Sequence, residues 1–149
     1  MIKKVEELPT WDLSDLYAGA DDPQLENDMQ SAREQAREFE RQFKGTIARD
    51  DLSGAHLRAA HDAYEALLNN QYRPQAYAML LFSTNTQDSQ RGALLQKTRE
   101  FGADVATHLV FFDLEIGQIS AGLYTTLIAS EDLSPYRHYI GPQRQLAIH

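Results

Sequence analysis

Residues 77–124, YAMLLFSTNTQDSQRGALLQKTREFGADVATHLVFFDLEIGQISAGLY, decide the fold because they read as two apolar helices separated by a polar break. In the second helix, apolar residues recur at intervals of three or four positions, which is the spacing of one face of an α-helix. This stripe consists of Phe101, Val105, Leu109, Phe112, Ile116, Ile119 and Leu123. The spacing predicts a long helix whose stripe is buried.

The segment 109–116 is apolar on nearly every side, because Val110, Phe111 and Leu114 lie off the stripe. A helix that is hydrophobic all round is typical of the centre of a bundle. A membrane-spanning helix would need roughly 18 or more apolar residues with few charges. Polar side chains interrupt this run at Asp104, His108, Asp113 and Glu115. We therefore predict a central bundle helix near residues 90–116 and no membrane partner.

The composition narrows the classes of function. The chain of 149 residues is long enough for one domain with a real core. Its 22 acidic and 14 basic residues give a formal charge of −8, which disfavours binding to nucleic acid or anionic lipid. It has no cysteine, so disulfides, thiolate nucleophiles and cysteine-bound metals are excluded. The start, MIKKVEELPTWDL, lacks the apolar region of a secretory signal, and we expect a cytoplasmic protein.

The N-terminal third predicts a docking segment followed by an amphipathic helix. Residues 1–20 read as a segment that docks on the body of the domain, with Trp11 as its anchor. The next helix is expected to begin with Asp22 as cap and Pro23 in the first turn, and to end at Gly45. Its buried stripe is predicted to be Leu25, Met29, Ala32, Ala36, Phe39 and Phe43.

A further helix is expected to begin after Asp51 or Ser53. Its predicted buried face consists of Leu57, Ala60, Tyr64, Leu67 and Leu68. We expect the pair 69–70, Asn-Asn, to loosen its end, and Pro74 either to begin a fresh helical segment or to kink a continuing one.

The polar run 83–89 and the C-terminal segment contain turn signals. Seven consecutive polar residues in 83–89 favour a helix end and a turn with Asp88 as the next cap, and a loop that touches a ligand or partner is the alternative. Near the C-terminus we predict a short helix with Ser134 as cap, Pro135 at its first position and a stop at residues 141–142, Gly-Pro.

Together these patterns predict an all-α fold: one compact antiparallel bundle of about five or six helices spanning residues 1–149. No strand is expected, because the β-branched runs are short and follow the helical period. The tail 141–149 ends in QRQLAIH without a stop signal, and we expect it to be cut or extended.

We assign no catalytic, cofactor-binding or metal-binding residue from the sequence, and a serine or threonine nucleophile outside a recognised motif stays an open alternative. His56 and His61 lie five positions apart, about 140° around a helix, whereas paired helical metal ligands are spaced by three or four. His138 reads as a surface or packing residue, and Asp113 and Glu115, two positions apart, face different directions on a helix. The sequence also lacks a phosphate-binding glycine loop, a Gly-x-Ser-x-Gly elbow and a His-Glu-x-x-His motif.

Four segments, in order, resemble the oligoendopeptidase F family of zinc metallopeptidases, of the thimet oligopeptidase type. The opening WDLSDLYAGADDPQLENDMQSAREQAREFERQFKGTI is similar to the family's N-terminus, and YAMLLFSTNTQDS to its helix followed by a Thr-Asn-Thr-x-Asp turn. EFGADVATHLVFFDLEIG resembles its Phe-Phe-x-Leu-Glu helix, and LSPYRHYIGPQR its Tyr-x-His-Tyr segment that ends on an arginine.

The resemblance implies a mostly helical zinc endopeptidase of several hundred residues, in which short peptides enter a channel between two lobes. The zinc helix of that family lies far downstream of the part present here, so no zinc ligand or catalytic residue is carried over to this chain. We expect the chain to be the isolated N-terminal lobe, either engineered or naturally truncated, whose partners are the missing catalytic domain and short peptides. A different hypothesis is a free-standing helical interaction module that self-associates through apolar helix faces.

Overall fold

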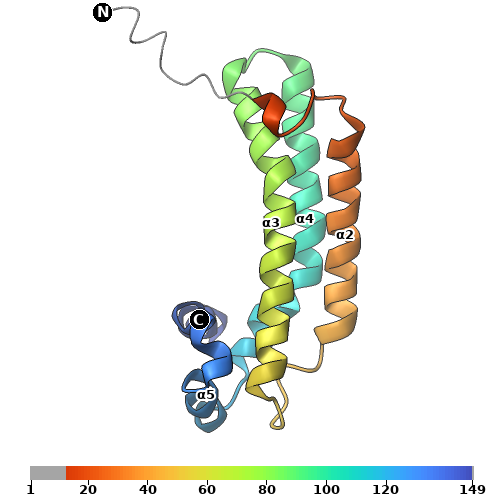
Figure 1. Cartoon of the computed structure of the whole chain (residues 1–149). Helices are drawn as coiled ribbons and strands as arrows, with labels where there is room; N and C mark the ends of the chain where they lie inside the picture. Colours follow the sequence, from red (N-terminus) through yellow and green to blue (C-terminus); the bar gives the residue numbers. More distant parts are fainter. Residues whose placement is uncertain (1–12, 149) are drawn as a thin grey trace, which may run out of the picture.

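Three long helices form an antiparallel bundle in the computed structural model, which describes residues 13–148 (Figure 1). They are α2 (Pro23–Phe43), α3 (Gly54–Thr84) and α4 (Ser89–Gly117). Three shorter helices, α5 (Ala121–Ile128), the 3₁₀ helix η2 (Glu131–Tyr136) and α6 (Arg137–Ile148), gather at the end of the bundle where α3 begins and α4 ends. No strand occurs between residues 13 and 148, so the prediction of an all-α bundle is confirmed.

The prediction for α2 is confirmed at its start and along its buried face. The side chain of Asp22 accepts a hydrogen bond from the backbone N–H of Gln24, and Pro23 occupies the first turn. The buried residues are those of the predicted stripe, Leu25, Met29, Ala32, Ala36, Phe39 and Phe43. After the helix, Gly45 takes a positive φ of 81°, which a residue without Cβ adopts at no steric cost. The stripe packs α2 against both α3 and α4.

The docking segment is described from residue 13, so Trp11 lies outside the described residues. The 3₁₀ helix η1 (Leu13–Asp15) contacts α3 at the end of the bundle opposite the short helices (Figure 1). Tyr17 is buried, and its hydroxyl donates a 2.6 Å hydrogen bond to Asp28 of α2. Arg73 of α3 donates to the carbonyl oxygen of Leu16. These contacts dock residues 13–17 on the bundle.

α3 is one continuous helix that begins after Ser53, whose side chain accepts from the N–H of His56. The expected loosening at residues 69–70 does not occur, and the helix continues through Pro74. Proline removes one backbone donor from a helix interior, but Leu67 before it and Tyr77 after it are both buried in the core. Tertiary packing of both halves outweighs the local penalty.

α4 occupies the predicted central position, since it contacts α2, α3 and α6. Asp88 caps it by accepting from the N–H groups of Gln90 and Arg91, as predicted. The expectation that 109–116 is covered on every side is wrong, because Val110 and Leu114 are 56% and 52% exposed. The three neighbouring helices leave one side of α4 open, and these two residues, four positions apart, lie on it.

The C-terminal elements differ from the predicted pattern. α4 ends at Gly117, so Ile119 and Leu123 do not extend its stripe, and a separate α5 begins after its cap Ser120. Ser130 rather than Ser134 caps η2, and Pro135 lies inside it.

α6 runs through the predicted stop at residues 141–142. Its Ile140 is 1% exposed, and the guanidinium of Arg144 donates to the carbonyl oxygen of Ile119 and lies over the ring of Tyr124. These anchors on both sides of Pro142 hold the helix together.

Within residues 13–148, no helix has both the length and the apolar composition that crossing a bilayer requires.

Candidate functional site

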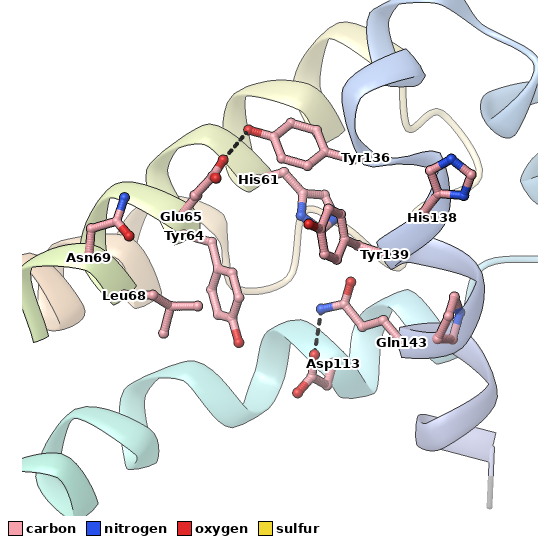
Figure 2. A pocket seen from close by; sticks show the side chains of 11 residues that line it. His61, Tyr64, Glu65, Leu68, Asn69, Asp113, Tyr136, His138, Tyr139 and Gln143 are labelled. Atoms are coloured by element: carbon pink, nitrogen blue, oxygen red, sulfur yellow. Dashed lines mark hydrogen bonds between the residues drawn. The ribbon is translucent and has the colours of Figure 1, made fainter. Parts of the chain in front are cut away.

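A half-open pocket of about 530 Å³ lies where α3, α4, η2 and α6 meet (Figure 2). Its volume is in the range of small-molecule sites. Aromatic rings and imidazoles dominate its lining: His61 and Tyr64 from α3, Tyr136 from η2, and His138 and Tyr139 from α6. Leu68 and Pro142 add apolar surface, and Glu65 and Asp113 add carboxylates. Packing of the short C-terminal helices against α3 and α4 therefore creates the pocket.

His61 is the buried polar group of the pocket, with 4% of its surface exposed. Its ring stacks on Tyr136 at 4.9 Å between centroids and meets the edge of Phe112 at 5.0 Å. Burial lowers the pKa of His61 to about 4, against the opposing influence of Asp113 and Asp62. The imidazole is therefore neutral at pH 7. Its Nε2 atom is buried and has no hydrogen-bond partner among the described residues.

Two carboxylates share the hydroxyl group of Tyr136. This hydroxyl contacts Asp62 and lies 3.0 Å from a carboxylate oxygen of Glu65. Asp62 also accepts from Arg58 at 3.2 Å, and the hydrogen bond from Tyr136 lowers the pKa of Asp62. Burial raises the pKa of the Tyr136 phenol, and its hydrogen bonds to both carboxylates raise it further. A phenol carries one proton, so Glu65 competes with Asp62 for it.

The third carboxylate of this region belongs to Asp113 of α4, which accepts a hydrogen bond from the side-chain amide of Gln143 (Figure 2). The amide oxygen of Gln143 is itself buried without a hydrogen-bond partner. The amide nitrogen faces the carboxylate, so the unpartnered atom is an acceptor.

Glu115, two residues after Asp113, points elsewhere, as predicted. Its carboxylate accepts from the backbone N–H groups of Gly45, Ile47 and Ala48 in the loop between α2 and α3. Glu115 is 9% exposed, and it holds this loop to the end of α4. Its role is therefore structural.

The four histidines within residues 13–148 do not assemble into a metal centre. His56 Nε2 lies 2.8 Å from the hydroxyl of Thr46, whereas His61 faces the pocket, and His138 is exposed on the pocket rim, as a surface residue should be. Between residues 13 and 148, no three histidine, aspartate or glutamate side chains are grouped so as to hold a metal ion. The described residues therefore do not fit the zinc ion of the resembled family.

The polar turn 83–89 uses its side chains locally. The carboxylate of Asp88 caps α4, and the Asn85 side chain accepts from the N–H of Gln87. Arg91 donates to the carbonyl oxygen of Leu81 and to the hydroxyl of Thr84. These contacts are those of a helix end and a turn, which favours the structural reading of this segment over a ligand-binding loop.

No protein-family model, curated protein or solved structure matches this chain.

Sequence reasoning assigned no site residue, and it did not predict the pocket. A signal was present in α3, where His61, Tyr64, Glu65 and Leu68 follow at intervals of three, one and three. These positions form one helical face, next to the buried face of Leu57, Ala60 and Leu67. No such signal indicated that η2 and α6 line the pocket, because the sequence pattern placed the helix start at Ser134 and a stop at residues 141–142, where the structure has neither.

Proposed function

We propose that this chain is the non-catalytic N-terminal lobe of an oligoendopeptidase F-like zinc peptidase, and that its pocket forms part of the wall of a channel for short peptides. One observation carries the proposal: two of the four segments that resemble the family meet at this pocket. FFDLE, residues 111–115, contributes Asp113, and LSPYRHYIGPQR, residues 133–144, contributes Tyr136, Tyr139 and Gln143.

The chemistry of the pocket supports a role in binding rather than in bond cleavage. Rings and short apolar side chains provide contact area, and the unpartnered amide oxygen of Gln143 suits an N–H group of a peptide. The neutral His61 packs against the rings of Phe112 and Tyr136, so its surroundings are those of a packing residue rather than of a general base. A zinc site would come from the catalytic domain that this lobe meets.

The test begins with the DNA downstream of the codon for His149. We expect the reading frame to continue to a His-Glu-x-x-His helix. The protein from the whole frame should then cleave an internally quenched peptide with zinc bound, and the 149-residue chain with added zinc, the matched control, should not. A stop codon directly after His149, or zinc-dependent cleavage by the short chain, would contradict the proposal.

A second candidate function is a helical module that self-associates. The observation that favours it is the exposure of large apolar side chains on α3 and α4: Tyr72 is 70% exposed, Met79 58%, Val110 56% and Leu114 52%. Tyr72 and Met79 line a second groove of about 400 Å³ between these helices. Contiguous exposed apolar surface promotes association. Sedimentation velocity should then show concentration-dependent dimers that a Tyr72→Ser, Met79→Ser variant loses, and a monomer at high concentration would count against this function.

A further inference from the structure

The pocket has more negative charge than the described residues neutralise. Glu65 and Asp113 line it, and no lysine or arginine is among its lining residues. Neither carboxylate has an ion-pair partner within residues 13–144, whereas the neighbouring Asp62 is paired with Arg58. Glu65 competes for the single phenol proton of Tyr136, and Asp113 has a neutral amide donor. The described lining of the pocket therefore has two carboxylates and neither lysine nor arginine.

A second, independent observation is that two buried polar side-chain atoms of the pocket lack hydrogen-bond partners in the part of the chain that the structure describes. His61 is more than nine-tenths buried, and its unpartnered Nε2 belongs to a ring that projects from α3 toward Tyr136 and α6 (Figure 2). The amide oxygen of Gln143 is a buried acceptor without a donor. A buried polar atom without a partner is costly, and a ligand with several N–H groups would satisfy the Gln143 oxygen.

The rings of the pocket suit a cation on an apolar stem. Tyr64 and Tyr139 present aromatic surface, and Tyr139 is 67% exposed at the rim. Aromatic faces attract ammonium and guanidinium groups, and arginine most often. Leu68 and Pro142 offer apolar contact for a methylene chain. A third tyrosine of the lining, Tyr136, already has such a group over its ring, since the guanidinium carbon of Arg58 lies 5.8 Å from the ring centroid.

We propose that the pocket binds a guanidinium group on an apolar stem, as in an arginine side chain, between the carboxylates of Glu65 and Asp113 and the rings of Tyr64 and Tyr139. That the stem belongs to a peptide rests on the proposed function, whereas recognition of the guanidinium does not. The planar group has five N–H donors and no acceptor, which matches a pocket with two carboxylates and an unpartnered amide oxygen.

The test measures fluorescence anisotropy of a fluorescein-labelled heptapeptide with arginine at its centre and alanine elsewhere. A second peptide has citrulline there, which keeps the shape and removes the charge. We expect the arginine peptide to bind about tenfold more tightly at low ionic strength, and high salt to reduce the difference. Glu65→Gln and Asp113→Asn should each weaken binding of the arginine peptide by about fivefold.

Glu100→Gln is the matched control, because Glu100 is an exposed carboxylate of α4 outside the pocket, and it should leave the affinity unchanged. Glu65 and Asp113 are also exposed, so their variants should keep the helical circular dichroism of the wild type. An equal loss of affinity for the arginine peptide in all three variants would overturn the inference, since it would show that binding depends on the net charge of the protein and not on the pocket.

A third probe, agmatine, separates this inference from the proposed function, because it has a guanidinium on a four-carbon stem and no peptide backbone. Its other end is an ammonium group, so 1,4-diaminobutane, which has ammonium groups only, is its control and should bind more weakly. Agmatine binding detected by calorimetry and lost in Asp113→Asn, together with no binding of either peptide, would support the guanidinium site and contradict the peptide-channel role. Equal affinity of the arginine and citrulline peptides would overturn the guanidinium site and leave the peptide role standing. Failure of all three probes to bind would overturn the inference.

Discussion

The contact between Glu115 and the loop after α2 gives the sharpest test of the fold. The carboxylate of Glu115 accepts from the N–H groups of Gly45 at 2.8 Å, Ile47 at 3.0 Å and Ala48 at 3.1 Å. One carboxylate of α4 therefore accepts all three backbone N–H groups and holds the loop to this helix. We consider Glu115→Ala, which removes the acceptor and leaves the helix-forming propensity high.

The loss of stability expected for Glu115→Ala depends on how deeply each of the three N–H donors is buried. The hydrogen bond of Ile47 is buried, and a buried donor that loses its acceptor costs about 1–3 kcal/mol. The bonds of Gly45 and Ala48 are partly buried, so water replaces part of what is lost there. The total is roughly 2–5 kcal/mol, a large fraction of the ~5–15 kcal/mol typical of a domain. Glu115→Gln keeps one acceptor oxygen and turns an NH₂ group toward a donor, and it should cost roughly 1–2 kcal/mol.

Urea unfolding followed by circular dichroism at 222 nm measures both changes. Glu100→Ala, at an exposed position of the same helix, is the control and should stay within about 0.5 kcal/mol of the wild type. Hydrogen exchange should also show faster exchange of the Ile47 amide in Glu115→Ala. If Glu115→Ala costs no more than Glu100→Ala, the carboxylate does not anchor this loop and the reasoning is refuted.

Three further predictions use the same unfolding assay. Phe112→Ala removes a fully buried ring and should cost about 3–5 kcal/mol. Leu114 is half exposed on the same helix, so Leu114→Ala should cost less than about 1 kcal/mol. Equal losses would mean that α4 is rotated about its axis relative to this structure. Gly45→Ala should destabilise the protein by about 1–2 kcal/mol because Gly45 has a positive φ. Gly122→Ala should stabilise it by up to about 1 kcal/mol because Gly122 lies in a helix with open space around it. A change of the same sign in the free energy of unfolding of both variants would contradict this prediction. The folded-state pKa of His61 is about 4, below the ordinary value of about 6.5, so the stability that depends on the neutral ring is complete above pH 6.5 and is lost as the pH falls toward 4. Between pH 7 and pH 5 the free energy of unfolding of the wild type should therefore fall by about 2 kcal/mol more than that of His61→Phe. Parallel pH profiles of the two proteins would show that His61 is not buried as a neutral ring.

The first half of the fold could be predicted from the sequence because local and tertiary requirements agree there. The six-residue stripe of α2 is the buried face that packs on α3 and α4. The caps Asp22 and Asp88 are made by the predicted residues, since an aspartate before an apolar-periodic run satisfies the free N–H groups of a helix start. Where the residues that form or cap a helix locally also meet the requirements of packing against its neighbours, the sequence pattern is enough to predict the helix.

The prolines mark where the sequence was insufficient. Pro74 and Pro142 both lie inside helices of the structure, although a proline in a helix interior costs about 3 kcal/mol. Leu67 and Tyr77 on either side of Pro74 are buried, and so is Ile140 before Pro142. Burial of these residues depends on partners far away in the chain, which a local rule does not contain. For the same reason the open side of α4 at Val110 could not be predicted, because it depends on how many helices surround α4.

Several exceptions to local rules surround the pocket, although Pro74 and the unpartnered amide oxygen of Gln71 lie outside its lining. Around the pocket, His61 Nε2 and the Gln143 amide oxygen are buried without partners, two carboxylates compete for the phenol proton of Tyr136, and a helix continues through Pro142. Stability alone does not explain this, since an apolar residue of similar shape in place of a poorly satisfied polar group is often neutral or stabilising. Departures from local consistency are expected at functional sites. A ligand with N–H donors and a positive charge would satisfy the amide oxygen of Gln143 and the carboxylates together, whereas the course of α6 through Pro142 follows from its anchors Ile140 and Arg144.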